Sequence, residues 1–301
     1  MKAEKRSSSI NSRSVTLYLL NKKGFRVLSA LCKDASLKGL INAVVGARDK
    51  GNNEDYYKEI RNLCQENSLP FYDRKTAFEN TSKYSIAVGW RWLIYNDSKL
   101  IVLHDSLLPK YRGFSPLVNM LINGENKLGV SAIFASEKMD EGEVIAQESV
   151  EINYPLKIQD AIALIAPLYQ KIVLYIFQKI KESQEILSVS QVESEATYSV
   201  WRDEDDYFID WNQGAEDIKR FVDAVGFPYG GARTRIRNGG VIKILDCEAV
   251  NVVSEINAPG KLIFKDKGPV FLCGENAVRL IKVTDLEGEP YTFNDFRIRL
   301  G

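Results

Sequence analysis

Over its first two hundred residues the chain alternates short apolar, β-rich runs with segments whose apolar residues recur at helical spacing. Strands are expected at residues 15–20, 40–47, 84–89, 100–104, 129–135 and 144–152. Helices are expected between and after them, at residues 25–33, 55–67, 115–122 and 157–183. Because parallel strands need crossover connections, this alternation predicts an α/β fold with a mainly parallel sheet that helices cover on both faces.

The pattern changes near residue 195, where short runs separated by glycine, proline and aspartate replace the alternation. One helical pattern is expected at 215–225, and strands are expected at 232–236, 240–246, 261–265, 269–273 and 278–282. Such short strands favour a small β-barrel or sandwich. We therefore expect a flexible N-terminal extension at 1–14, a first domain at 15–190, a linker within 187–199 and a β-rich second domain at 200–301.

Charge is balanced across the 301 residues, because 40 lysines and arginines face 40 aspartates and glutamates. Residues 200–301 hold 14 basic and 17 acidic side chains, which leaves 26 basic and 23 acidic side chains in the rest. A protein that binds nucleic acid or an anionic membrane through bulk charge is expected to be basic. The count therefore disfavours both kinds of partner.

The four cysteines, Cys32, Cys64, Cys247 and Cys273, lie far apart in the sequence and form no Cys-x-x-Cys pair. This spacing fits reduced thiols better than a disulfide framework or a zinc cluster. The most apolar stretch, 158–180, is interrupted by charged and amide side chains. It contains no uncharged run of the roughly 18–20 residues that a membrane span needs. We expect a cytoplasmic protein with no membrane partner.

The chain has one histidine, His104, at the end of the strand expected at 100–104. Ligands of open α/β sheets bind beyond the carboxyl ends of the strands, and imidazole ordinarily titrates near neutrality. The following loop, 106–113, combines a proline, a glycine, two cations and two hydroxyls. It suits an anionic ligand held by backbone N–H groups and Arg112. The alternatives are a histidine satisfied within the core and an ordinary strand-to-helix connection.

A second candidate is the acidic turn M-D-E-G-E at 139–143, between two expected strands. A carboxylate in this turn could orient His104 or accept a proton from a substrate amine. The alternative is a solvated surface turn without a chemical role. The two candidates are separated in sequence, so only a fold that joins them makes one site.

Together, H-D-S-L-L-P-K-Y-R-G at 104–113 and D-E-G at 140–142 resemble the folate-dependent formyltransferase family. Its methionyl-tRNA formyltransferase-like members carry an H-x-S-L-L-P-x-Y-R-G loop and a later D-x-G turn. Further similar passages lie at 123–125, 129–131, 144–147, 209–211 and 227–232. The resemblance covers roughly residues 80–300 and is weakest before them.

The resemblance implies a Rossmann-like formyltransferase domain followed by a smaller, OB-like β-barrel. It also implies transfer of a formyl group from the co-substrate N10-formyltetrahydrofolate to a primary amine, with no metal. Attack by the amine builds an oxyanion and an ammonium group that must lose a proton. By this analogy the catalytic residues are His104, which stabilises or protonates the oxyanion, and Asp140, which accepts or relays the amine proton.

The same analogy places the pterin of the folate against Trp90, Arg91, Leu93, Lys138, Met139 and Asp140. The amine acceptor would face the loop residues Ser106, Lys110, Tyr111, Arg112 and Gly113. Lys110 and Arg112 are candidate contacts for a diphosphate. The alternatives are core packing for Trp90 and solvated loop cations for Lys110 and Arg112.

One position departs from the family pattern, which has asparagine two residues before the histidine. Here that residue is Val102. An oxyanion-hole donor contributes a factor of roughly 10²–10³ to the rate, so its loss should lower the rate of formyl transfer. Three explanations remain open: a nearby donor such as Ser106 or the backbone of Asp105 substitutes, the enzyme is slow or uses another acyl donor, or the protein binds ligands without catalysis. Asp105 either belongs to a rewired site or caps the next turn.

The family's branches act on methionyl-tRNA, glycinamide ribonucleotide or nucleotide-linked amino sugars. A second domain disfavours the glycinamide branch, and the neutral charge disfavours tRNA. The spelling W-R-W-L at 90–93 resembles the sugar branch. We therefore expect a sugar N-formyltransferase whose partner is a nucleoside-diphosphate amino sugar, in bacterial surface polysaccharide (O-antigen) synthesis. Methionyl-tRNA formylation and a non-catalytic folate- or sugar-nucleotide-binding protein are the alternatives, and a homodimer is left open.

Overall fold

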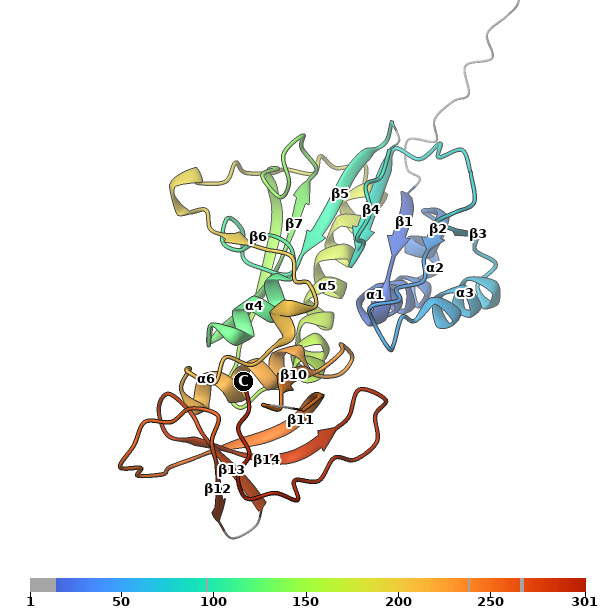
Figure 1. Ribbon diagram of the computed structural model, residues 1–301. Helices are drawn as coiled ribbons and strands as arrows, with labels where there is room; N and C mark the ends of the chain where they lie inside the picture. Colours follow the sequence, from blue (N-terminus) through green and yellow to red (C-terminus); the bar gives the residue numbers. More distant parts are fainter. Residues whose placement is uncertain (1–14, 96, 238, 266–267) are drawn as a thin grey trace, which may run out of the picture.

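The structure is a computed structural model that describes residues 15–95, 97–237, 239–265 and 268–301 (Figure 1). The extension expected at 1–14 lies outside the described residues. The first part of the chain forms a seven-stranded sheet in the order β3-β2-β1-β4-β5-β7-β8. Its strands are β1 (Val15–Leu19), β2 (Ile41–Gly46), β3 (Phe71–Asp73), β4 (Tyr84–Val88), β5 (Lys99–His104), β7 (Lys127–Phe134) and β8 (Val144–Glu151).

Five neighbouring strands, from β3 to β5, run parallel, and β7 and β8 complete the sheet in antiparallel orientation. The expected mainly parallel sheet is therefore confirmed. In the pairing of β5 with β7, His104 lies opposite Ser131. The histidine thus sits at the carboxyl end of the last parallel strand, where the next strand already runs the other way.

The helices of this part are α1 (Asn21–Cys32), α2 (Ala35–Lys38), α3 (Tyr57–Glu66), α4 (Pro116–Ile122) and α5 (Ile158–Lys181). Each long helix buries one stripe of apolar side chains, as in α1 with Val27, Leu28 and Leu31. Helix α2 was not expected, because a single turn carries no periodicity. It begins at Asp34, whose carboxylate accepts hydrogen bonds from the backbone N–H groups of Ser36 and Leu37.

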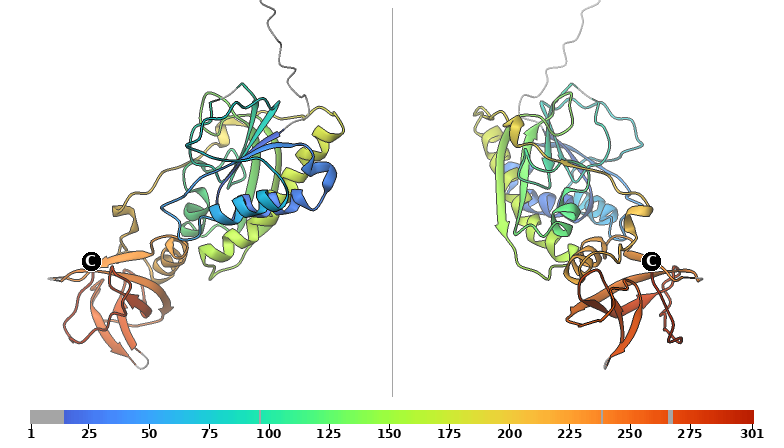
Figure 2. Two further views of the ribbon diagram at one scale, coloured as in Figure 1. Left: turned by 90° about the vertical axis from the view of Figure 1, so that its right-hand side faces the viewer. Right: turned by 60° about the vertical axis from the view of Figure 1, so that its left-hand side comes forward.

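The described helices of this part gather on one face of the sheet, where α1 packs against α2, α3 and α5 (Figure 2). The expectation of helices on both faces is wrong. The opposite face carries a small cluster of Tyr18, Val45 and Ala87, with Trp90 and Val102 packed against it. Side chains at alternate positions of a strand share a face. His104 therefore lies on this face, which none of the described helices covers, two residues beyond Val102.

Helix α5 has the length and apolar composition that could cross a membrane, with a mean hydropathy of 1.5 over its most apolar window. Half of that window is buried inside the fold, against β7, β8 and α1. Its buried positions include Ile165, Tyr169 and Ile176, which recur at helical spacing. A long buried stripe of this kind is what a core helix also requires.

The last third of the chain forms α6 (Ala215–Val225) and a five-stranded antiparallel sheet in the order β10-β11-β14-β13-β12. The strands are β10 (Ala232–Arg235), β11 (Val241–Val250), β12 (Leu262–Lys265), β13 (Gly268–Leu272) and β14 (Ala277–Thr284). The sheet curls, and the last residues bridge its two edges through the pairs Ile236–Leu300 and Lys261–Arg299. The expected β-rich domain is thus a curled five-stranded sheet whose two edge strands, as far as the structure describes them, are joined through the last residues of the chain and not directly to each other.

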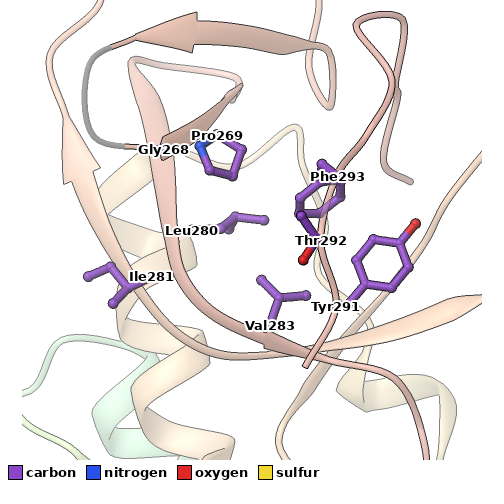
Figure 3. A pocket seen from close by; sticks show the side chains of 8 residues that line it. All are labelled: Gly268, Pro269, Leu280, Ile281, Val283, Tyr291, Thr292 and Phe293. Carbon is purple, nitrogen blue, oxygen red and sulfur yellow. The ribbon is translucent and has the colours of Figure 1, made fainter. Parts of the chain in front are cut away.

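The curled sheet contains a hollow of about 260 Å³ on one face (Figure 3). Side chains of Leu280, Val283, Tyr291 and Phe293 line it. Helix α6 contacts both this sheet and α4, which joins the two parts of the molecule (Figure 1). None of the candidate catalytic or binding residues lines the hollow, so it lies apart from the candidate site.

Candidate active site

His104 is buried, with 7% of its surface exposed, and both of its ring nitrogens face oxygen atoms. Its Nε2 lies 2.7 Å from the backbone oxygen of Tyr111, and its Nδ1 lies 3.5 Å from Oδ2 of Asp140. A neutral imidazole has one N–H and can donate to only one of these oxygens, whereas the doubly protonated ring can donate to both. The ring is therefore held between a backbone oxygen and a carboxylate.

Asp140 is positioned by its own backbone and by the loop that follows His104. Its φ is +58°, in the left-handed region, so the backbone turns tightly at this residue. Oδ2 of that carboxylate accepts a hydrogen bond from the backbone N–H of Gly113 at 2.8 Å. The two motifs that the sequence singled out, around His104 and Asp140, are thus brought into one site.

Gly113 is needed where the loop meets the chain leading to the second part. Its φ is +102°, and a Cβ added there would lie 2.4 Å from the backbone oxygen of Ser199. Gly113 belongs to a two-residue strand, β6 (Arg112–Gly113), which pairs in parallel with β9 (Tyr198–Ser199). Neither strand was expected, because two residues carry no pattern.

Ser106, an expected acceptor contact, is fully buried, and its Oγ donates to the backbone oxygen of Lys110 at 2.6 Å. From β7, Ser131 accepts the N–H of Leu108 at 3.0 Å and donates to the oxygen of Ser106 at 2.6 Å. Gln147 of β8 donates to Ser131 and to the oxygen of Leu108. Ser106 thus braces the loop from within, whereas Lys110 and Gln147 are exposed.

Tyr111 has a φ of +60°, and its hydroxyl donates to Oε1 of Glu125 at 2.6 Å. Asn123 donates to the same hydroxyl at 3.0 Å. Burial, followed by the hydrogen bond to Glu125, raises the pKa of Tyr111 above its ordinary value. The ring therefore anchors the loop to the segment between α4 and β7, while the Tyr111 backbone oxygen contacts Nε2 of His104.

Arg112 has a fully buried side chain, with 2% exposure, which is unusual for a cation. Its Nη1 donates to Oε2 of Glu193 at 2.9 Å, and Glu141 lies 3.7 Å away. Its Nε and Nη2 both donate to Oε1 of Gln191, at 3.2 and 3.1 Å. Burial alone would lower the pKa of Arg112, but the hydrogen bond to Glu193 and further contacts outweigh it, so the pKa is raised.

Residues 187–199, expected as a linker, form a strap across the site, and we use this name below. Val189 of the strap exchanges backbone hydrogen bonds with Val144, at 2.8 and 2.9 Å. Thr197 accepts the N–H of Tyr111 through its hydroxyl and that of Arg112 through its backbone oxygen, both at 2.9 Å. The segment between the two parts thus holds the loop after His104. Sequence reasoning missed the strap because its residues form no periodic pattern.

Of the residues expected at the pterin, some contact other side chains of the first part and others are exposed. Trp90 packs edge-on against Tyr18 and Trp92, and its buried indole N–H has no partner among the described residues. Arg91 donates to Oδ1 of Asp49 at 2.6 Å. Three further members are exposed: Leu93, Lys138 and Met139. The unpaired indole N–H of Trp90 leaves one donor for a ligand.

Asp105 neither caps a turn nor faces His104's partners. It forms an ion pair with Lys23 of α1 and accepts a hydrogen bond from the hydroxyl of Tyr169 of α5. Burial alone would raise the pKa of Asp105, but the charge of Lys23 and the hydrogen bonds from Lys23 and Tyr169 outweigh it, so the pKa is lowered. This buried cluster ties the end of β5 to the helical layer.

Neither a metal cluster nor a reactive thiol is evident in the part of the chain that the structure describes. That part holds no group of three or more histidine, cysteine, aspartate or glutamate side chains suited to a metal. Its cysteines are free, and burial raises the pKa of Cys64, Cys247 and Cys273 to about 12. His104 and Asp140 are the imidazole and the carboxylate that meet in the described site.

Two models of known protein families match the chain. The formyl transferase model matches residues 88–163, and the model of the formyl transferase C-terminal domain matches residues 202–299. The chain belongs to the formyltransferase family. The first match contains the whole His104 loop and the Asp140 turn, and the second contains α6 and the curled sheet.

Curated relatives of this formyltransferase-family chain include methionyl-tRNA formyltransferases. That of Protochlamydia amoebophila is 32% identical over 204 residues, which cover 66% of this chain and 62% of the relative. That of Carboxydothermus hydrogenoformans is 29% identical over 198 residues, which cover 64% of this chain and 62% of the relative. The matches thus span less than two thirds of each relative's own length.

Solved structures share the fold at low sequence identity. The sugar 3N-formyl transferase WlaRD has a TM-score of 0.65 at 16% identity, covering 89% of this chain and 97% of WlaRD. An N-formyltransferase from Helicobacter canadensis has a TM-score of 0.66 at 16% identity, covering 89% and 98%. Methionyl-tRNA formyltransferase from Clostridium thermocellum has a TM-score of 0.53 at 15% identity, covering 89% and 98%. These likenesses concern the fold.

Proposed function

We propose that the protein transfers a formyl group from N10-formyltetrahydrofolate to a primary amine. The observation that carries the proposal is the buried pair of His104 and Asp140, with Nδ1 and Oδ2 3.5 Å apart at the carboxyl end of β5. The donor is supported by the solved relatives, since WlaRD was crystallised with 5-N-formyl-THF and the Helicobacter canadensis protein with folinic acid. A proton-exchanging pair is what amine formylation requires.

In the proposed reaction the amine nitrogen attacks the formyl carbon, and the electron pair of the C=O bond moves to oxygen. His104 stabilises this oxyanion through a ring N–H, and Asp140 accepts the proton that the new ammonium group releases. The oxyanion then re-forms the C=O bond while the bond from carbon to N10 breaks, and N10 keeps the electron pair and takes up the proton that Asp140 had accepted. The products are the formamide and tetrahydrofolate.

In the proposed reaction the oxyanion binds at Nε2, which the Tyr111 backbone oxygen contacts at 2.7 Å. The loop of residues 109–113 must therefore shift before Nε2 can donate to the formyl oxygen. Asp140 holds the same loop through the N–H of Gly113. Loop movement and the position of the carboxylate are thus linked in the proposed cycle.

For the acceptor we propose a nucleoside-diphosphate amino sugar. The Helicobacter canadensis relative was solved with dTDP-3-aminofucose, and WlaRD with dTDP. Their TM-scores, 0.65 and 0.66, are higher than the 0.53 of the methionyl-tRNA enzyme from Clostridium thermocellum, whose chain is covered to the same extent. The net charge of zero also favours a small acceptor over tRNA. Methionyl-tRNA is the second candidate acceptor, because the curated relatives at 29–32% identity are named methionyl-tRNA formyltransferases.

Direct assay of formyl transfer tests the reaction and the acceptor together. We expect the purified chain to formylate a dTDP-, UDP- or GDP-linked amino sugar with N10-formyltetrahydrofolate. His104→Ala and Asp140→Asn should each lower kcat by roughly 10²–10⁴-fold, the range of a lost acid–base group. Formylation of charged initiator tRNA instead, with loss of rate as salt rises, would favour the second candidate.

Ligand binding separates a lapsed enzyme from an active one, which matters because Val102 stands in the family's asparagine position. A ligand at about one hundred times its Kd should stabilise the fold by roughly 2.7 kcal/mol. Stabilisation by 5-formyltetrahydrofolate and by one nucleotide class, without turnover, would show a binding protein. Stabilisation by none of them would contradict the proposed function.

A further inference from the structure

Gln191 of the strap uses all of its hydrogen-bonding capacity at one place beside the proposed catalytic pair. Its Oε1 accepts two N–H groups of Arg112, at 3.1 and 3.2 Å. Its Nε2 donates to the backbone oxygens of Asp140 and Gly142, both at 2.7 Å. An amide offers two acceptor sites and two donors, so no capacity is left over.

The turn that Gln191 holds places Asp140 in a backbone conformation that is uncommon for residues other than glycine. The φ of Asp140 is +58°, in the left-handed region. Gly142 lies so close to β7 that an added Cβ would be 1.7 Å from the oxygen of Phe134. The turn is therefore pressed against the sheet on one side and held by Gln191 on the other.

Arg112 is the fixed point to which Gln191 ties this turn. Its buried guanidinium is held by Glu193 at 2.9 Å, and its backbone is paired with the strap through Thr197. The neighbouring residue, Gly113, donates its N–H to the Asp140 carboxylate. The side chain of Gln191 thus connects the acidic turn, which carries Asp140, to the loop that follows His104. The relative position of this turn and this loop sets the distance from Asp140 to His104.

We propose that Gln191 is a positioning residue, which holds Asp140 at His104 by fixing the backbone oxygens of the acidic turn to Arg112. The inference rests on the proposed function, since it assigns a role within the same site. Gln191 touches neither ring nitrogen of His104 and acts through the turn. The strap is accordingly part of the active site's framework.

Gln191→Glu tests this role because it preserves the size of the side chain and the acceptor for Arg112, while it removes the N–H donor and adds a negative charge. The new carboxylate still accepts from Arg112, which keeps its buried charge paired. It has no N–H for the oxygens of Asp140 and Gly142, and its charge repels them. We expect kcat to fall about 10- to 100-fold, as for a displacement of about 1 Å, with KM for both substrates changed less than about threefold.

Gln184→Glu is the matched control, because Gln184 is exposed and accepts a hydrogen bond from Lys179 that a carboxylate also accepts. It makes the same chemical change near the strap, away from the turn. Gln191→Met, which has nearly the same length but neither the donor nor the amide acceptor, serves as the second variant. It is judged by the same kinetic criterion if Gln191→Glu does not fold.

The single histidine provides a readout that needs no turnover. The ring ¹⁵N signals of the chain's one histidine come from His104 without further assignment. We expect Gln191→Glu to move these signals toward those of Asp140→Asn, while Gln184→Glu leaves them unchanged. This result holds even if no acceptor is found, so failure of the proposed function and failure of the positioning role are distinguishable.

Two outcomes would overturn the positioning role. The first is a folded Gln191→Glu whose kcat and His104 signals match those of the parent chain, which would show that Gln191 serves only to pair Arg112. The second is an equal loss in Gln184→Glu, which would show that added negative charge, rather than the lost donor, lowers the rate.

Discussion

Replacing Asp105 by asparagine should destabilise the fold strongly, although Asp105 follows the candidate catalytic histidine. The carboxylate is 15% exposed, its partner Lys23 is 12% exposed, and the hydroxyl donor Tyr169 is 1% exposed. Asparagine keeps the size of the side chain but leaves the ammonium group without its counter-charge. Breaking a buried ion pair from one side costs about 3–5 kcal/mol. The residual exposure places Asp105→Asn near the lower end of that range.

Tyr169→Phe provides the internal comparison, because it removes only the hydroxyl that donates to Asp105. Loss of a hydrogen bond to a charged group costs about 1.5–3 kcal/mol, less than loss of the counter-charge. Urea unfolding at pH 7 measures both changes, with the exposed Asp295→Asn as a control expected within about 0.5 kcal/mol of the parent. The expected order of destabilisation is Asp105→Asn, then Tyr169→Phe, then the control.

The dependence on pH gives this prediction a second test. The folded-state pKa of Asp105 lies below its ordinary value, because Lys23 and the hydrogen bonds outweigh burial. Its ionised form therefore stabilises the fold at pH values above the unfolded pKa of about 3.9. That contribution is lost as the pH falls through the folded pKa. The difference between the parent and Asp105→Asn should accordingly be constant near neutrality and shrink below about pH 4.

Two results would refute the reasoning on Asp105. A cost below about 1 kcal/mol at pH 7 would show that the pair behaves as an exposed one. A difference from Asp105→Asn that stays the same down to acid pH would show that its charge is not what stabilises the fold.

Two further predictions concern the site. Val102→Asn should raise kcat about tenfold or more, because it restores a donor on the face of the sheet that carries His104. Burying the amide in the apolar cluster should cost about 1–3 kcal/mol of stability. Steady-state kinetics and urea unfolding measure the two effects, and an unchanged kcat in a folded variant would count against a missing donor. Gly113→Ala should destabilise by about 1–3 kcal/mol and lower kcat, since its Cβ meets the oxygen of Ser199 at a φ of +102°. Gly240→Ala, with open space around its Cβ, is the control expected to change neither.

Local patterns in the sequence were enough to predict most helices and strands. Helix α6 begins and ends at the expected residues 215 and 225, and β4 and β5 lie within one residue of their expected bounds. Apolar periodicity and turn residues act over a few positions, so they are readable without a partner. The motifs at 104–113 and 140–142 likewise led to the family that the comparisons show. The roles of the individual site residues stay predictions.

Only the tertiary structure decided what the polar residues of the site contact. Arg112 is typical of a surface cation in sequence, yet residues 79 and 81 positions later in the chain bury and pair it. Asp105 finds its partner 82 positions earlier, in Lys23. The strap has no pattern of its own because its stability comes from hydrogen bonds to β6, β8 and the acidic turn. A hydrogen bond or ion pair depends on atoms that folding brings within about 3 Å, and sequence spacing does not carry that information.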